Sequence, residues 1–88
     1  MRRISVIVVT WNNENTIGEC LDALLGECTD SDEIIVIDNA SSDRTVEVVS
    51  KRDVLVVANR DNFGFTKAVN QGYNLSSGEY VFVLNGDV

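Results

Sequence analysis

The fold of this chain is decided by one stretch, ISVIVVTWN at residues 4–12. Its first part, from Ile4 to Val9, is almost wholly aliphatic and β-branched, where a half-exposed strand would alternate apolar and polar residues. The pattern predicts a strand covered on both faces, at the centre of a parallel sheet. Thr10, Trp11 and Asn12 follow at its end, where their side chains are placed to line a site.

Three later apolar runs share this character and also end in polar residues. They are Ile34 to Ile37, Val54 to Ala58 and Tyr80 to Leu84. Between the strands, capping residues and apolar residues at three- and four-residue steps predict helices. The first helix is expected from about Glu14 to Leu25 and is ended by Gly26. The second follows Ser41 or Ser42 as its cap, with Val46 and Val49 buried. The third is expected from about Thr66 to Leu75, with these residues facing inward: Ala68, Val69, Gly72 and Tyr73.

Strands and helices that alternate in this way join through right-handed crossovers and form a parallel sheet. The predicted fold class is therefore α/β, with three layers: a mainly parallel sheet and helices on both of its faces. The commonest strand order is 3-2-1-4, which brings together the carboxyl ends of strands 1, 2 and 4, where a ligand would bind. Neighbouring strands lie about 4.8 Å apart, so these ends span roughly 10 Å, about the extent of a nucleoside with its diphosphate.

Composition narrows the class of protein. The chain has 88 residues, so it is one domain or part of one, and its net charge of −7 disfavours a nucleic-acid partner. Cys20 and Cys28 form no C-x-x-C motif and the chain has no histidine, which disfavours a zinc site or a redox motif. The cysteines are expected to be buried free thiols, as suits a reducing cytoplasm. No run is long enough to span a membrane.

Two familiar phosphate-binding motifs are absent. The loop after the first strand lacks the glycines of G-x-G-x-x-G, and G-x-x-x-x-G-K-[ST] does not occur. A metal ion remains as the means of holding phosphates, and Asp87 at the end of the last strand is the natural oxygen ligand for Mg²⁺ or Mn²⁺. One carboxylate binds such ions weakly, so a diphosphate would have to complete the coordination shell.

The residues at the strand ends each admit two interpretations. Trp11 either stacks on a nucleobase or covers the edge of the core. Asp38 and Asn39 either offer acceptors to a base or ribose, or form an Asx turn into the next helix. The segment Asn85-Gly86-Asp87 is either part of a ligand site or an ordinary turn.

Taken together, four segments resemble the nucleotide-binding half of a family 2 glycosyltransferase of the GT-A fold, which contains a Rossmann-like half-domain. The segments are SVIVVTWN at 5–12, IVIDNASSD at 35–43, NRDNFGF at 59–65 leading to NQG at 70–72, and residues 78–87. They cover nearly the whole chain, in the family's order and at its spacing. The combination is similar to the branch that holds rhamnosyltransferases, which bears on the donor sugar only by analogy.

The resemblance implies roles for individual residues. Trp11 matches the aromatic residue that stacks on the nucleobase, and Asn39 stands where the family often has an aspartate that reads the base. Asn85-Gly86-Asp87 occupies the metal-binding D-x-D motif, with a carboxamide in place of the first carboxylate, which weakens metal binding. The implied nucleotide-binding residues are Thr10, Trp11, Asn12, Asp38, Asn39, Gly64, Lys67 and Asn85, and the implied ligand of Mg²⁺ or Mn²⁺ is Asp87.

The implied reaction is inverting transfer of a sugar from a nucleotide-diphosphate sugar, of the UDP or dTDP type, to a hydroxyl of a glycan or lipid-linked acceptor. Such a reaction serves polysaccharide or cell-surface glycan synthesis. The metal would stabilise the departing diphosphate and a carboxylate base would remove the hydroxyl proton. In the family this base follows the D-x-D motif, so we expect residues 1–88 to be the donor-binding portion of a truncated domain. No catalytic base is expected before Val88, and no transfer by these residues alone.

A different class of function stays open, a non-catalytic α/β nucleotide-binding or regulatory module, because asparagines stand at positions 39 and 85. An isolated four-stranded fragment also leaves its sheet edges open, which predicts homodimers, strand exchange or poor solubility. We expect a cytoplasmic location, with a peripheral position at the inner membrane face as the alternative for a full-length protein.

Overall fold

The computed structural model describes residues 3–86, in which strands and helices alternate as predicted. In chain order the elements are β1 (Ile4–Thr10), α1 (Ile17–Glu27), β2 (Glu33–Asp38), α2 (Thr45–Ser50), β3 (Leu55–Ala58), α3 (Phe65–Leu75) and β4 (Tyr80–Asn85). Asp87, the predicted metal ligand, lies outside the described residues.

The four strands of residues 3–86 form a single sheet in the order β3-β2-β1-β4, and every neighbouring pair is parallel. The α/β class and the predicted strand order are confirmed. β1 is central: it pairs with β2 as far as Thr10 opposite Asp38, and with β4 as far as Val9 opposite Asn85. The register therefore brings the polar ends of these three strands to one end of the sheet.

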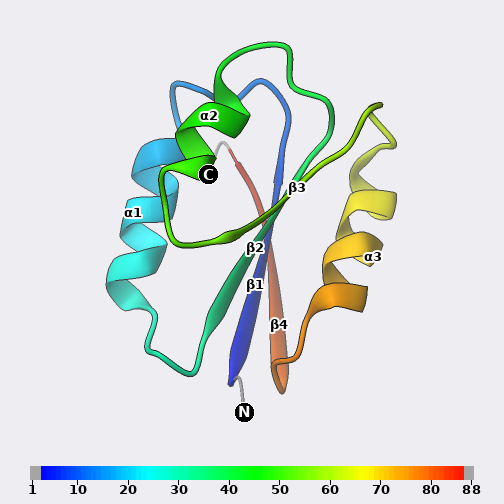
Figure 1. Ribbon diagram of the computed structural model, residues 1–88. Helices are drawn as coiled ribbons and strands as arrows, with labels where there is room; N and C mark the ends of the chain where they lie inside the picture. The colour runs from blue at the N-terminus through cyan, green and yellow to red at the C-terminus, as the bar shows by residue number, and fades with distance from the viewer. Residues whose placement is uncertain (1–2, 87–88) are drawn as a thin grey trace.

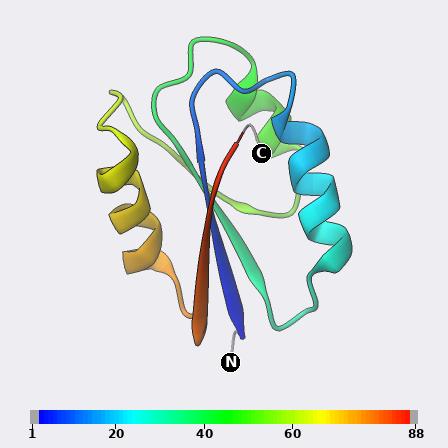
Figure 2. The same ribbon diagram turned by 180° about the vertical axis from the view of Figure 1, so that it is seen from behind.

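Helices cover both faces of the sheet and complete the three layers. α1 and α2 lie on one face and α3 on the other (Figure 1), as the view from behind also shows (Figure 2). Successive residues of a strand point to opposite faces. Val8 accordingly belongs to the core cluster that contains Leu21 of α1, while Ile7 belongs to the cluster that contains Ala68 of α3. The aliphatic run of β1 is thus buried on both sides.

The two outer strands are less covered than predicted. β3 and β4 each have one neighbour in the sheet, and large apolar side chains on them stay half exposed, among them Leu55, Tyr80 and Phe82. The expectation that these runs are covered on both faces, as β1 and β2 are, is wrong. Their composition resembles that of β1, but coverage depends on the place of a strand in the sheet, and no strand within residues 3–86 pairs with their outer edges.

α1 differs from the prediction at both ends. It begins at Ile17 and not at Glu14, because a turn comes first in which the Asn13 carbonyl accepts the N–H groups of Thr16 and Ile17. Gly26 does not end the helix but lies within it, exposed and with no other atom within 4 Å of the position a Cβ would take. A glycine near a helix end is not sufficient to stop the helix when nothing else bends the chain there.

α2 begins at Thr45, so neither Ser41 nor Ser42 caps it. The two serines instead hydrogen-bond to residues at the ends of β1 and β2. The predicted burial of Val49 is confirmed, but Val46 is only partly buried, and the hydroxyl-bearing Thr45 takes the second buried position.

α3 and the cysteines depart from the predicted burial. Ala68 and Gly72 are buried as predicted, whereas Tyr73 is 62% exposed, because it lies on the side of α3 that faces away from the sheet. Cys20 and Cys28 are free thiols but only partly buried, so the expectation of full burial is wrong. Partial burial still raises the pKa of both thiols, which keeps them protonated and unreactive at neutral pH.

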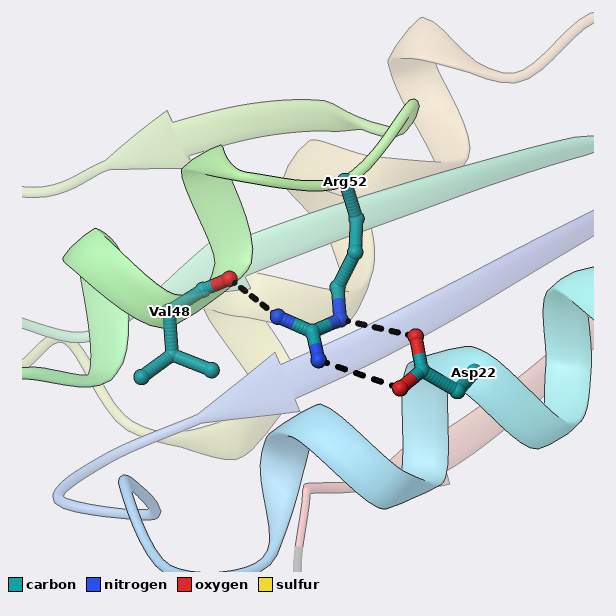
Figure 3. Close-up of polar contacts among 3 residues, drawn as sticks. All are labelled: Asp22, Val48 and Arg52. Atoms are coloured by element: carbon teal, nitrogen blue, oxygen red, sulfur yellow. Dashed lines mark hydrogen bonds and ion pairs between the residues drawn. The ribbon is translucent and has the colours of Figure 1, made fainter.

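Arg52, just after α2, ties α2 to α1 (Figure 3). Its Nε and Nη2 donate to the two carboxylate oxygens of Asp22 at 3.0 and 3.1 Å, and its Nη1 donates to the Val48 carbonyl at 2.8 Å. This two-pronged geometry is the favourable one for an arginine and a carboxylate. The bonds from Arg52 hold the pKa of Asp22 below its ordinary value of 3.8.

The Asp22–Arg52 pair predicts one component of the pH dependence of stability. A carboxylate whose pKa is lowered on folding stabilises the fold above its unfolded-state pKa, and that contribution disappears as the pH falls through the folded-state pKa. We therefore expect the stability difference between the native chain and Asp22→Asn to be constant above about pH 5 and to shrink below about pH 4. Urea denaturation at a series of pH values measures it, and a difference that grew on acidification would contradict this expectation. High salt should reduce the difference, because the pair is at the surface.

Candidate functional site

A hollow of about 450 Å³ lies at the carboxyl ends of β1, β2 and β4, where the loops gather at the top of Figure 1. Its lining consists of Val9, Thr10, Trp11, Asn13, Asn39, Asn62, Gly64, Phe65, Asn85 and Gly86. Four of these ten residues are asparagines, and none carries an ionisable side chain. Among the described residues the hollow is therefore neutral and rich in amide groups, with an aromatic ring on two of its walls.

Thr10, which lines the hollow, forms a buried polar pair with Asp38, which does not line it. Thr10 Oγ1 donates to Asp38 Oδ1 at 2.6 Å, across the register that pairs β1 with β2, and both residues are almost completely inaccessible. Asp38 Oδ2 also accepts the Ser41 backbone N–H at 2.9 Å, and its Oδ1 accepts the Ser41 hydroxyl. Asp38 thus holds the turn that follows β2, which is the second of its two interpretations. Both of its carboxylate oxygens accept hydrogen bonds from Thr10 and Ser41.

The loop after β1 is fixed by bonds to the loop after β2. The backbone N–H of Asn12 donates to Ser41 Oγ, and Asn12 Oδ1 accepts the N–H of Ser42, each at 2.8 Å. Asn12 takes a left-handed conformation with φ 52°, which turns its side chain toward these partners. Asn13 Oδ1 in turn accepts the Trp11 N–H at 2.8 Å. These bonds hold the backbone of Trp11 while its ring stays 55% exposed at the mouth of the hollow.

Asp43 reinforces the same loops. Its carboxylate accepts the hydroxyl and N–H of Thr45 and the N–H of Glu14. Burial raises the pKa of Asp43, but these hydrogen bonds outweigh the burial and hold the pKa below its ordinary value. The carboxylate is consequently charged at neutral pH and joins the β1 loop to the start of α2.

The end of β4 forms the remaining wall. Asn85 lies exposed at the tip of the strand, and the N–H of Gly86 donates to the Val9 carbonyl at 2.9 Å. The Gly86 carbonyl accepts the Thr16 hydroxyl at 3.0 Å. A Cβ on Gly86 would lie 2.8 Å from Asn13 Oδ1, so only glycine lets the chain pass this close to the β1 loop. The turn before Asp87 is therefore packed against the loop that carries Trp11.

The structure brings together some of the predicted site residues and separates others. Thr10, Trp11, Asn39, Gly64 and Asn85 line the hollow. Asp38 and Asn12 do not line it: Asp38 bonds to Thr10, and Asn12 bonds to Ser41 and Ser42. Lys67 is away from it, on α3, with its Nζ 5.9 Å from the centre of the Phe63 ring. Asn12 and Lys67 are thus absent from the lining of the hollow, and their assignment as nucleotide-binding residues stays a prediction.

Asn13, Asn62 and Phe65 line the hollow but were not predicted to do so. Asn62 and Phe65 belong to the segment NRDNFGF, whose resemblance to the family was the available signal. Asn13 carried no comparable signal, because its place depends on how the loop after β1 folds back.

Residues 3–86 contain neither a membrane-spanning helix nor a cluster of metal-binding side chains. None of the helices there combines the length and the apolar character needed to cross a bilayer. Within the same residues, no group of three or more aspartate, glutamate, histidine or cysteine side chains is placed to hold a metal ion.

The class of protein that this fold and hollow define is a GT-A glycosyltransferase domain. Over 97% of its length the chain matches the structure of Staphylococcus aureus TarS 1-349 in complex with UDP-GlcNAc, with a TM-score of 0.89 and 30% identity. It also matches the mannosyltransferase PcManGT of Pyrobaculum calidifontis, solved in complex with GDP-Man and Mn²⁺, over 99% of the chain, with a TM-score of 0.89 and 29% identity.

The chain belongs to the glycosyl transferase family 2, which it matches over residues 5–88. It is 33% identical, over 96% of its length, to the poly-beta-1,6-N-acetyl-D-glucosamine synthase of Staphylococcus aureus. The chain spans 21% of that synthase and 26 to 28% of the two solved structures. The predicted family is thus confirmed, whereas the rhamnosyltransferase branch stays a prediction.

Proposed function

We propose that this chain is the donor-binding part of an inverting glycosyltransferase and that the hollow holds a nucleotide-diphosphate sugar. One observation carries the proposal: Trp11, directly after β1, and Asn85, at the end of β4, line a single hollow with the dimensions of a small-molecule site. Support comes from TarS and the Pyrobaculum mannosyltransferase, which have this fold and were solved with UDP-GlcNAc and with GDP-Man.

In this proposal the nucleobase stacks on Trp11, whose ring is exposed and whose backbone is held by Asn13. The diphosphate extends toward Asn85 and Gly86 at the tip of β4. The hydrogen bond between Thr10, which lines the hollow, and Asp38 joins the ends of β1 and β2, and their engaged oxygens do not touch the ligand. The chain's own residues thus bind and orient the donor.

A divalent ion, Mg²⁺ or Mn²⁺, is part of the proposal. Asn85 offers a carboxamide oxygen at the strand tip, which suits a hard cation, but it contributes no charge. Asp87, outside the described residues, would supply the carboxylate, and the donor diphosphate would complete the shell. When bound, such an ion stabilises negative charge on the departing diphosphate.

The donor that we propose is of the UDP or dTDP type, and the acceptor a hydroxyl of a glycan or lipid-linked glycan, in polysaccharide synthesis. The related Staphylococcus aureus synthase is named for a polysaccharide product, which supports this choice. The acceptor site and the catalytic base are properties of a whole enzyme, of which this chain covers about a quarter in its relatives.

Titration with UDP and dTDP, in the presence and absence of Mn²⁺, tests the proposal against the alternative of a non-catalytic module. Isothermal calorimetry should show binding that depends on the metal, because the hollow itself has no positive charge to hold a diphosphate. Absence of binding at millimolar ligand would instead favour a module that has kept the fold without the donor site.

Replacing Trp11 by alanine should weaken UDP binding by about 5- to 150-fold, which corresponds to the 1 to 3 kcal/mol of one base stacked on an aromatic ring. The free energy of unfolding should stay nearly unchanged, because more than half of the Trp11 surface is already in water. Tyr73→Ala is the matched control, since Tyr73 is an equally exposed aromatic that does not line the hollow. Equal affinities for UDP in all three proteins would show that the ring does not hold the base.

We also propose that the chain by itself associates through β4, whose outer edge has no strand partner within residues 3–86. Phe82 on this strand is 55% exposed, and an exposed apolar edge strand favours pairing with a second copy. Light scattering should show a dimer that forms as the concentration rises, and Phe82→Glu should return it to a monomer. Leu55→Glu, on the opposite edge, is the control that should leave the dimer intact. A native chain that is monomeric at all concentrations would rule this out.

A further inference from the structure

Asn39 holds the loop between β3 and α3 at both of its ends. Asn39 Nδ2 donates to the Gly64 carbonyl at 3.1 Å, and Asn39 Oδ1 accepts Asn59 Nδ2 at 3.2 Å. Asn59 and Gln71 exchange two further hydrogen bonds, of 2.8 and 2.9 Å, between their carboxamides. This network of three carboxamides, Asn39, Asn59 and Gln71, joins the end of β2, the end of β3 and the body of α3.

The side chain of Asn39 has little capacity left for a ligand. Asn39 is 3% exposed, and its oxygen also receives a long contact of 3.4 Å from the Phe63 N–H. Its bond to the Gly64 carbonyl requires a donor, because a carbonyl oxygen can only accept. An aspartate at this position has no N–H group, and its negative charge would face the lone pairs of that carbonyl. The choice of asparagine therefore follows from the contact with Gly64.

The Gly64 carbonyl matters because it is placed at the start of α3 and beside the hollow. It accepts the Ala68 N–H, the first bond of α3, as well as Asn39 Nδ2. Gly64 has φ 87°, a conformation that glycine adopts readily, and it precedes Phe65. Gly64, Asn62 and Phe65 together form the wall of the hollow contributed by this loop. Fixing the Gly64 carbonyl therefore fixes that wall.

We propose that Asn39 is a positioning residue: it sets the loop wall of Asn62, Gly64 and Phe65 against the hollow and does not itself read the nucleobase. Its effect on ligand binding rests on the proposed function, whereas its effect on the loop does not. A residue that reads the base changes the preference between bases, because it bonds to one base edge. A residue that shapes an aromatic wall affects all bases alike, because every base has a face that can stack.

The test uses Asn39→Asp, which removes the donor but keeps the size of the side chain. Arg60, exposed in the loop, offers a trypsin cleavage site, and cleavage of a folded protein follows the population of the opened loop. Mass spectrometry of the ligand-free protein should show cleavage after Arg60 that is about three- to tenfold faster in the variant, the effect of one lost neutral hydrogen bond. With Mn²⁺ present, the affinity for UDP and the affinity for GDP should both fall, and by the same factor as each other, so that their ratio is unchanged.

Asn74→Asp is the matched control, because Asn74 is exposed on α3, outside the network and the hollow. Its cleavage rate and affinities should equal those of the native chain. If Asn39→Asp fails to fold, Gln71→Ala, which frees Asn59 from α3 without altering the hollow, should give cleavage after Arg60 about threefold faster.

Unchanged cleavage in the folded Asn39→Asp variant, or in Gln71→Ala where that variant replaces it, would overturn the proposal. So would a change in the ratio of UDP to GDP affinity, since that ratio reports direct reading of the base. If the native chain binds neither nucleotide, the proposed function fails, and the cleavage rates still decide whether Asn39 holds the loop.

Discussion

Replacing Gly72 by alanine should lower the free energy of unfolding by about 2 kcal/mol. Gly72 lies in α3 where the helix crosses β1, and a Cβ there would be 2.5 Å from Cγ2 of Ile7. Ile7 is completely buried at the centre of the sheet, so it cannot move aside without displacing its neighbours. Overpacking costs about 1 to 3 kcal/mol, and a 2.5 Å approach to a completely buried side chain places this change at the upper end of that range. The gain of up to about 1 kcal/mol from replacing glycine in a helix then leaves a net loss of about 2 kcal/mol.

Gly26→Ala makes the same chemical change with the opposite expected sign. Gly26 is also helical, but it is exposed and a new Cβ meets no atom within 4 Å. Stability should therefore rise, by a few tenths to about 1 kcal/mol, through helix propensity alone. Urea denaturation of both variants measures the difference. A Gly72→Ala protein as stable as Gly26→Ala would mean that α3 does not pack on β1 as closely as described.

Replacing Asp38 by alanine should lower the free energy of unfolding by about 3 kcal/mol and abolish detectable UDP binding. The change leaves two donors without their acceptor: the completely buried Thr10 hydroxyl and the partly buried Ser41 N–H. A hydrogen bond to a charged group contributes about 1.5 to 3 kcal/mol, and buried donors left unpaired add a desolvation cost. The ends of β1 and β2 lose the side-chain hydrogen bond that joins them beside the hollow, so the position of the lining residue Thr10 is no longer fixed.

Asp38→Asn refines this prediction. With the amide oxygen toward the Thr10 and Ser41 hydroxyls, the amide NH₂ faces the Ser41 N–H, and two donors then oppose each other. The variant should therefore also be destabilised, though less than Asp38→Ala. Asp53→Asn, an exposed aspartate at the opposite end of the sheet, is the control and should change neither stability nor binding. Native-like UDP affinity in Asp38→Ala would contradict the role of Asp38 in holding the ends of β1 and β2.

The central place of β1 in the sheet could be predicted because an aliphatic run of this kind occurs where a strand is covered on both faces. A run from Ile4 to Val9 that is β-branched at every position but Ser5 requires cover on both faces, and a strand buried in this way belongs at the centre of a parallel sheet. The exposure of Phe82 on β4 could not be predicted in the same manner. A run of apolar residues has the same composition in a central strand and in an edge strand. Its exposure depends on which other strands pair with it, and the run itself does not show this.

The candidate site divides along a similar line. Trp11 and Asn85 were predicted at the hollow because both stand at strand ends, whose position follows from the register of the sheet. The direction of the Asn12 side chain depends on a positive φ within a loop, and that of Lys67 on the rotation of α3. The carboxamide network of Asn39 joins residues up to 32 positions apart (71 − 39), so no local pattern announces it.

The central place of β1 has a consequence for how this segment is made in the cell. β1 is synthesised first, yet one of its two partners is β4, whose Tyr80 lies opposite Ile4 at a separation of 76 residues (80 − 4). At about 5 to 20 residues per second, a ribosome takes on the order of ten seconds to cover that distance. During this interval the edge of β1 that later pairs with β4 has no partner on the nascent polypeptide. Molecular chaperones that recognise extended aliphatic segments should therefore bind residues 4–10 during translation. They should release these residues once β4 has emerged and can pair with β1.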